Sequence, residues 1–243
     1  LIAPREAPRS VVNRAIGRNR RFATQQLETA RLRNVAQALD GTLNDVVLAL
    51  CAGAMRRLLS EQGTLPDEPM TAMLPVNTRP KGDPGGGNAV GAVLATLATD
   101  IADARERFEA ITASTRRAKE QLSGLSQNAI LQYSAMIVAP VIFSQIPGAA
   151  ERVRPAFNLV VSNVPGPREH LYFRGHRLDA YYPLSIPFHG YALNITVVTY
   201  VDTLNFGFTA DRDAVPHMQR LALYARDALE ELEACVSAQG KRP

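Results

Sequence analysis

The segment 42–63, TLNDVVLALCAGAMRRLLSEQG, most strongly limits how this chain can fold. Its apolar residues recur with the 3.6-residue period of a helix, and Arg56, Arg57 and Glu61 fall near its end. The pattern predicts a helix that is buried over its first half and turns toward solvent after it. Asn44 and Asp45 stand at the start of the apolar run, where unpaired polar side chains are costly to bury.

Strand and helix patterns alternate along the rest of the 243 residues, of which 46% are hydrophobic, enough for a sizeable core. Strands are predicted at 20–28, 70–77, 89–100, 157–164, 174–183, 191–202 and 203–211, with a tight turn at Asp202 and Thr203. Further helices are predicted at 29–41, 102–123, 129–143 and 215–236. The expected fold class is α/β, with long helices packed on a mixed β-sheet.

Arginine is concentrated at the amino terminus, where six arginines precede residue 22 and only Glu6 offsets them. We interpret residues 1–24 as a basic linker arm and residues 25–243 as one α/β domain. The alternative for the arm is a binding site for phosphates or anionic lipid. Because the chain opens at Leu1 inside this arm, we expect it to be a fragment of a longer protein.

Residues 78–88, TRPKGDPGGGN, contain three consecutive glycines and predict a flexible loop. The segment lacks the lysine and hydroxyl residue that end a P-loop, so it does not predict a phosphate cradle.

Net charge and cysteine content exclude several classes of function. Lys and Arg outnumber Asp and Glu by 27 to 23, a bias too weak to indicate nucleic acid. Cys51 and Cys235 support neither a disulfide framework nor a cysteine metal site. With no signal peptide and no run of 18 apolar residues, we expect a cytoplasmic protein. Any contact with the inner face of the membrane or with a lipid droplet would be peripheral.

The usual catalytic motifs do not occur. The four histidines are isolated in predicted loops or at element ends, without the spacing of metal ligands. The chain also has no G-x-S-x-G nucleophile elbow and no G-x-G-x-x-G at a helix start. No metal is therefore expected, and these patterns alone do not specify a reaction.

Five linked segments nevertheless form a recognisable series. They are GTLNDVVLALCAGAMRRLL, LPVNTRP, GNAVGAVLATL, LVVSNVPGP and YYPLSIPFHGYALNITVVTYVDTLNFGFTADRD. In this order they resemble the carboxy-terminal half of the bacterial wax ester synthase/acyl-CoA:diacylglycerol acyltransferase (WS/DGAT) family, over about residues 8–232. The resemblance implies the fold of chloramphenicol acetyltransferase and of condensation domains, in which two similar α/β halves enclose an active-site tunnel.

The resemblance also implies an activity. Members of the family transfer a fatty acyl group from acyl-CoA to a long-chain alcohol or diacylglycerol, forming wax ester or triacylglycerol. Acyl-CoA is then a substrate, and no cofactor is expected. The family's catalytic base is the second histidine of an HHxxxDG motif in the amino-terminal half, whereas this chain has no adjacent histidine pair. We therefore expect a separate amino-terminal half as partner, no nucleic acid, and an inactive chain on its own.

The pair Asn44 and Asp45 matches the ND motif of the family, which faces the tunnel. Thr42 and Asp45 also fit a helix start in which Thr42 is the N-cap and Asp45 the N3 residue, so a structural role is favoured for Asp45. This arrangement leaves Asn44 without a role. We therefore predict that Asn44 is catalytic, orienting the base or donating to the oxyanion, and we keep Asp45 among the tunnel-lining candidates.

Further tunnel-lining or substrate-binding candidates come from two polar stretches that match the family. In SNVPGP, Ser162 and Asn163 end a strand, and Pro165-Gly166 indicates a type II turn in which glycine supplies a positive φ. In PLSIPFHGYALNIT, the polar residues are Ser185, His189, Asn194 and Thr196. Period-2 alternation places Asn194 and Thr196 on one face of a strand.

Two other functions remain open on the sequence. One is a non-catalytic module that binds acyl lipids. The other is a condensation-type domain that takes its acyl group from a carrier protein. The missing histidine motif does not separate them, because all three would look alike in this half of the fold.

Overall fold

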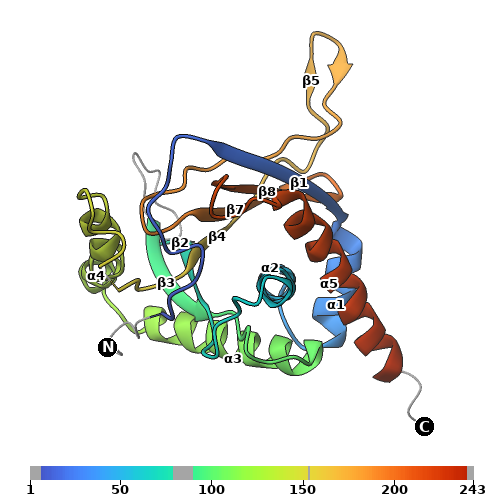
Figure 1. The fold of residues 1–243 in the computed structure, drawn as a ribbon. Coiled ribbons are helices and arrows are strands. Elements are labelled where there is room, and N and C mark those ends of the chain that lie inside the picture. The colour runs from blue at the N-terminus through green and yellow to red at the C-terminus, as the bar shows by residue number, and fades with distance from the viewer. Residues whose placement is uncertain (1–6, 79–89, 153, 240–243) are drawn as a thin grey trace.

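The fold is built on one mixed β-sheet of six strands, in the order β1-β8-β7-β4-β2-β3 (Figure 1). The structure is a computed structural model that describes residues 7–78, 90–152 and 154–239. The sheet strands are β1 (Arg20–Glu28), β2 (Thr71–Asn77), β3 (Val90–Thr96), β4 (Leu159–Val164), β7 (Leu193–Tyr200) and β8 (Thr203–Asp211). Strand β4 runs parallel to β2 and β7, and the other pairs are antiparallel. The predicted mixed α/β class is confirmed.

Five helices cover the sheet unequally. They are α1 (Thr29–Ala38), α2 (Leu43–Glu61), α3 (Ala104–Ser123), α4 (Gln127–Ser144) and α5 (Met218–Gln239). Figure 1 shows α1, α2, α3 and α5 grouped on one side of the sheet, with α4 apart near β3. The main core joins that group to the sheet, and a smaller core joins α4 to the opposite face through Ile137, Phe157 and Tyr191.

Helix α2 lies at the centre of the main core, with α3, α5 and the sheet around it (Figure 1). Its buried residues extend from Asp45 to Leu59, so the predicted apolar face is present but continues well past the first half, and only Arg57, Ser60 and Glu61 of the second half are exposed. No single neighbouring element could bury all of these apolar side chains. Their burial therefore requires the sheet, α3 and α5 to pack around α2 together.

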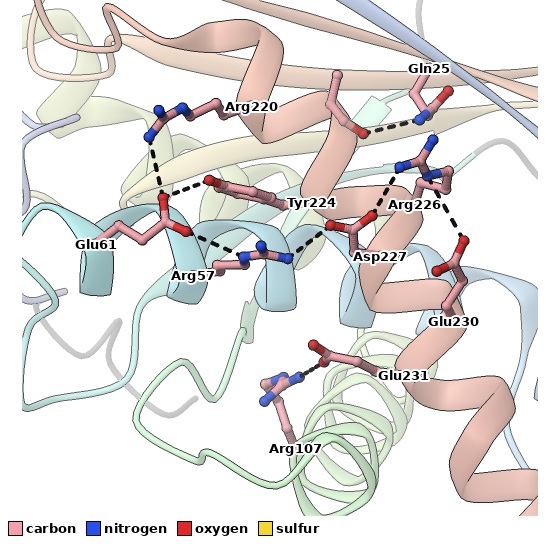
Figure 2. A network of polar contacts seen from close by, with 11 residues as sticks. Gln25, Arg57, Glu61, Arg107, Arg220, Tyr224, Arg226, Asp227, Glu230 and Glu231 are labelled. Atoms are coloured by element: carbon pink, nitrogen blue, oxygen red, sulfur yellow. Dashed lines mark hydrogen bonds and ion pairs between the residues drawn. The ribbon is translucent and has the colours of Figure 1, made fainter.

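Polar contacts join the exposed end of α2 to α5 (Figure 2). The Tyr224 hydroxyl donates to Glu61 at 2.5 Å, and Arg57 lies over the Tyr224 ring, 4.1 Å from its centroid. Arg57 also pairs with Asp227 at 2.8 Å. The Tyr224 hydrogen bond is the main cause that lowers the pKa of Glu61. Exposed pairs of this kind contribute little individually, so they set the position of α5 rather than the bulk of the stability.

The predicted linker arm is packed into the fold from residue 7 onward, as far as the structure describes it. The boundary predicted after residue 24 falls inside β1, which pairs with β8 from Arg20. Val12 is fully buried, and the Asn13 side-chain amide donates to the carbonyls of Phe157, Asn158 and Gly190. Because these partners are far away in sequence, the local abundance of Arg, Pro and Gly gave no indication of them.

Two other expectations need correction. The strand predicted at 174–183 is limited to β6 (His176–Arg177), which pairs with β5 (Tyr172–Phe173) in a separate ribbon projecting from the body (Figure 1). Arg174 and Gly175 form the turn between these two strands, with positive φ, and residues 178–183 belong to no strand. The tight turn predicted at Asp202 and Thr203 lies one residue earlier, since Thr203 already pairs with Tyr200. The loop predicted at 78–88 lies, apart from Thr78, outside the described residues.

Within the described ranges, no single helix is long and apolar enough to cross a bilayer. Only α1 and α2 taken together reach that length and composition, and they are bent by 100°.

Burial of Cys51 in α2 predicts a loss of stability at alkaline pH. Burial raises the pKa of the Cys51 thiol from 9.0 to about 12. The unfolded chain therefore loses this proton near pH 9 while the folded chain keeps it, so the free energy of unfolding should fall as pH rises from 9 toward 12. Denaturant titrations should show a shallower fall for Cys51→Ala, at a cost of about 1 kcal/mol at neutral pH.

The Cys51→Ala variant keeps Tyr191, whose pKa is also raised by burial to about 12. The free energy of unfolding of the variant should therefore still fall as the pH rises, but less steeply. Equal slopes for wild type and Cys51→Ala would show that the thiol does not contribute.

Candidate functional site

A hydrogen-bonded polar cluster lies on the face of the sheet opposite α2. Ser185 and Thr196 hydroxyls lie 2.6 Å apart, and Thr196 Oγ1 donates to Asn194 Oδ1 at 2.9 Å. Because a hydroxyl has one proton, Ser185 must donate to Thr196. Asn194 and Thr196 are only 9% and 7% exposed. The expectation that they share one strand face is confirmed.

The order of these hydrogen bonds leaves a donor unused. Asn194 accepts through its oxygen, and its amide nitrogen has no hydrogen-bond partner among the residues that the structure describes. Chains of hydrogen bonds polarise one another, so the Ser185 and Thr196 hydroxyls strengthen the amide as a donor. Ser162 lies beside Thr196 in the β4–β7 register and extends the cluster by one polar residue.

Gly207 allows the segment that carries Ser185 to lie flat on the sheet. A β-carbon at Gly207 would collide with the Pro183 carbonyl, so any larger residue would displace the segment. Thr209 faces the same segment, and its hydroxyl accepts from the Ser185 backbone N–H at 3.5 Å. Gly207 and Thr209 are not among the residues predicted for the site. The period-2 alternation of β8 places both residues on one face of the strand. In the register with β7, Gly207 lies opposite Thr196 and Thr209 lies opposite Asn194.

Asn163 does not join this cluster. It is adjacent to Ser162 in a strand, so the two side chains point to opposite faces of the sheet. Asn163 instead lines a cavity of about 540 Å³, together with Leu43 at the start of α2 and Thr29 at the start of α1. The predicted tunnel-lining residues are therefore divided between two faces of the sheet.

The turn predicted at Pro165-Gly166 is wrong in its backbone conformation. Gly166 is not among the described glycines with positive φ. Its role is a close approach, because a β-carbon there would meet the Thr199 carbonyl and the Tyr181 hydroxyl. The Gly166 N–H also donates to Thr199 Oγ1 at 2.8 Å. The turn is therefore held against β7 at the edge of the cavity.

Asp45 has a structural role in this geometry. Its carboxylate accepts from the Thr42 N–H at 2.8 Å and from the Thr115 hydroxyl at 2.5 Å, and the Asp45 N–H donates to Thr42 Oγ1. This is the predicted helix start, a complete capping box. The added bond to Thr115 ties the start of α2 to α3. The carboxylate thus faces α3, where Asp45 lines a smaller surface hollow.

Asn44 is half-buried, between a residue that lines the cavity and a residue that binds α3. Leu43 before it lines the 540 Å³ cavity, and Asp45 after it binds α3. Within the described part of the chain, the Asn44 amide has no hydrogen-bond partner. The local fold therefore accounts for Asp45 and leaves the Asn44 side chain available.

His189 is held by structural contacts. Its Nδ1 accepts from the Ile16 N–H at 3.1 Å, and its carbonyl accepts from Ser144 Oγ at 2.6 Å. These bonds fasten the amino-terminal segment and α4 to the start of β7. Among the described residues, no group of three or more His, Cys, Asp or Glu side chains could hold a metal ion.

Comparisons with known proteins agree on one family. The family model for the WS/DGAT C-terminal domain matches residues 86–233, and the model for the wax ester synthase/diacylglycerol acyltransferase catalytic domain matches residues 1–47. The first model alone covers more than half of the chain. The second includes Asn44 and Asp45.

Individual relatives give the same result. The chain is 50% identical to a Mycobacterium tuberculosis protein assigned by name to the diacylglycerol O-acyltransferases, over 99% of this chain and 49% of the relative. It is 42% identical to the O-acyltransferase WSD of Acinetobacter baylyi, over 96% of this chain and 51% of that protein.

A solved structure is also similar. The wax ester synthase/diacylglycerol acyltransferase of Marinobacter aquaeolei VT8 matches with a TM-score of 0.85 and 37% identity, over 95% of this chain and 53% of that one. The chain thus spans about half the length of the relatives it matches.

The capping box predicts a measurable link between α2 and α3. Asp45→Ala removes a cap and a charge-assisted hydrogen bond, so we expect a loss of about 2 kcal/mol in the free energy of unfolding. In a Thr115→Val background the loss should be smaller, because the bond to α3 is already gone. Chemical denaturation of the four proteins in this double-mutant cycle measures the difference.

Asp103→Ala is the matched control. Asp103 caps α3 by accepting from the Arg105 and Glu106 N–H groups. It is exposed, so we expect a loss of only about 1 kcal/mol. If Asp45→Ala cost the same with and without Thr115, the proposed link between the helices would be absent.

Proposed function

The chain belongs to the wax ester synthase/diacylglycerol acyltransferase family, and on this basis we propose that it forms one wall of an O-acyltransferase active site. The enzyme would transfer a fatty acyl group from acyl-CoA to a long-chain alcohol or diacylglycerol, giving wax ester or triacylglycerol. The observation that carries this proposal is the similarity to named O-acyltransferases over nearly the whole chain.

The reaction needs two kinds of group. A general base takes the proton of the attacking hydroxyl, and hydrogen-bond donors stabilise the oxyanion that forms at the thioester carbonyl. We assign the base to an amino-terminal half, since this chain has no HHxxxDG motif. The unpaired amides of Asn44 and Asn194 are donors that this half would supply. They lie in different surroundings, so we assign the oxyanion contact to Asn44 and a substrate contact to Asn194.

Exposed apolar side chains support the need for a companion half. Leu184 and Ile186, on the segment over the sheet, are 68% and 69% exposed. Helix α4 is apolar in composition, yet Leu131, Ile142 and Phe143 on it are also exposed. The end of α4 contacts His189, so the two apolar regions are neighbours. We propose that the amino-terminal half packs on this surface.

A non-catalytic module that binds acyl lipids is the second candidate, because the same exposed apolar residues would suit an acyl chain. A condensation-type domain that uses a carrier protein is the third. The deciding experiment mixes the chain with an amino-terminal half that carries HHxxxDG and supplies acyl-CoA with hexadecanol or diacylglycerol. Each half alone, and the same acyl group on a carrier protein, are the comparisons.

The outcomes separate the three functions. Ester formation that requires both halves and free acyl-CoA supports the proposal. Fatty acyl binding by this chain without turnover in the mixture supports the lipid-binding module. A strong preference for the carrier-bound acyl group supports the condensation-type reaction.

The assignment of Asn44 predicts a change in rate without a matching change in stability. Loss of one oxyanion donor typically costs about 3 kcal/mol of transition-state stabilisation, so Asn44→Ala should lower kcat about 100-fold. The melting temperature should change little, because no described residue pairs with the amide. Steady-state kinetics of the two-half enzyme and thermal unfolding of the chain measure the two effects.

Asn34→Ala is the matched control, since Asn34 is an exposed asparagine in α1. It should keep full activity. An Asn44→Ala enzyme with unchanged kcat would remove Asn44 from the mechanism while leaving the family assignment intact.

A further inference from the structure

The cavity beside Asn163 contains two arginines without acidic partners. Arg33, one turn into α1, and Arg168, after the SNVPGP turn, both line it. Across the described ranges, neither guanidinium forms an ion pair or a hydrogen bond. Arg31 on the same helix differs, because it binds Glu233 through two hydrogen bonds of 2.8 and 2.6 Å. The fold therefore uses Arg31 for its own stability and leaves Arg33 and Arg168 available.

The start of α1 adds an unpaired polar group to the same wall. Thr29 lines the cavity and is only 3% exposed, yet its hydroxyl has no hydrogen-bond partner in the described structure. Buried hydroxyls without partners are rare and costly. No side chain caps this helix, since the side chain of the N-cap residue Glu28 makes no capping bond. The carboxylate of Glu28 at the N-cap makes no hydrogen bond to the helix start, so the positive end of the helix dipole has no hydrogen-bonded side-chain anion among the described residues.

The net charge of the wall favours an anion. Asp202 is the acidic residue that lines the cavity, and it stands against the two arginines. Its backbone carbonyl accepts from the Thr29 N–H at 2.8 Å, which fixes the turn at the start of α1. Two guanidinium groups, a hydroxyl donor and a helix start together form the set of groups that binds phosphate.

We propose that this cavity binds a phosphate group through Arg33, Arg168 and the Thr29 hydroxyl. Its volume of about 540 Å³ is in the range of small-ligand sites. Leu43 also lines it, so it opens beside the start of α2, next to Asn44. The phosphates of acyl-CoA are the favoured source, and this identification rests on the proposed function. A phospholipid headgroup carries the same chemistry and is the other source.

Calorimetric titration of the purified full chain tests the site without any acyl transfer. The probes are coenzyme A, adenosine 3′,5′-bisphosphate, pantetheine and inorganic phosphate, and vesicles with and without phosphatidylglycerol are titrated separately. We expect coenzyme A and the bisphosphate to bind and pantetheine, which has no phosphate, to bind at least tenfold more weakly. Arg33→Gln and Arg168→Gln should each weaken binding about tenfold.

Two further variants separate binding from folding. Arg31→Gln removes the same charge from the same helix but lies in an ion pair, so it should lower the melting temperature and leave binding unchanged. Thr29→Val keeps the side-chain shape and deletes the hydroxyl. It should weaken binding without lowering the melting temperature, whereas a hydroxyl with a purely structural role would leave binding unaffected.

Equal affinity of the wild type and the Arg33→Gln/Arg168→Gln double variant for every phosphate probe would overturn the proposal. Binding of phosphatidylglycerol vesicles that depends on both arginines, with no binding of coenzyme A, would support the phosphate site and identify lipid as its source. Phosphate binding in an enzyme that forms no ester would contradict the proposed function alone. Ester formation with unchanged KM for acyl-CoA in the double variant would contradict acyl-CoA as the source of the phosphate and leave the proposed function intact.

Discussion

The structure depends on the burial of one helix. The apolar side chains of α2 point in several directions, so the sheet, α3 and α5 must all pack on it at once. Hydrophobic burial is not directional and does not by itself fix where the helix begins. The capping box of Thr42 and Asp45 supplies that fixed point, and the bond from Thr115 ties it to a second helix. The remaining polar end of α2 is positioned by contacts with α5 (Figure 2).

The two faces of the sheet then have different roles. The face toward α2 is filled by core side chains, whereas part of the other face carries a polar row that includes Asn194 and Thr196. Gly207 lets an extended segment lie across this second face, and Ser185 on that segment completes the hydrogen bonds. Asn163 and Asn44 belong to neither arrangement. Asn163 lines the cavity near the end of β4, and Asn44 follows Leu43, which lines the same cavity at the start of α2.

The sequence was most informative where local periodicity decides the structure. It predicted β1, α2 and β8 closely, because each has one clear hydrophobic period and a definite end. It failed at 174–183, which contains the turn and the second strand of a separate ribbon and ends at Pro183, over Gly207 of the sheet. It also failed for Asn13 and Gly166, whose roles come from contacts with residues far away in the chain. Of the candidate site, it predicted the shared face of Asn194 and Thr196. It did not predict the separation of Ser162 from Asn163 or the structural contacts of His189.

The opposite surroundings of Asn44 and Asp45 have a consequence for the evolution of the family. Asp45 interacts with Thr42 and Thr115, so a change at position 45 can be compensated at those two positions, and the three should vary together among relatives. Asn44 has no such partner in the described structure, so none of the described residues offers a position at which a second substitution would compensate for its loss. These two adjacent residues of one motif would then show different substitution patterns. Changes at Asp45 would be coupled to the packing of α3, and changes at Asn44 would be independent of it.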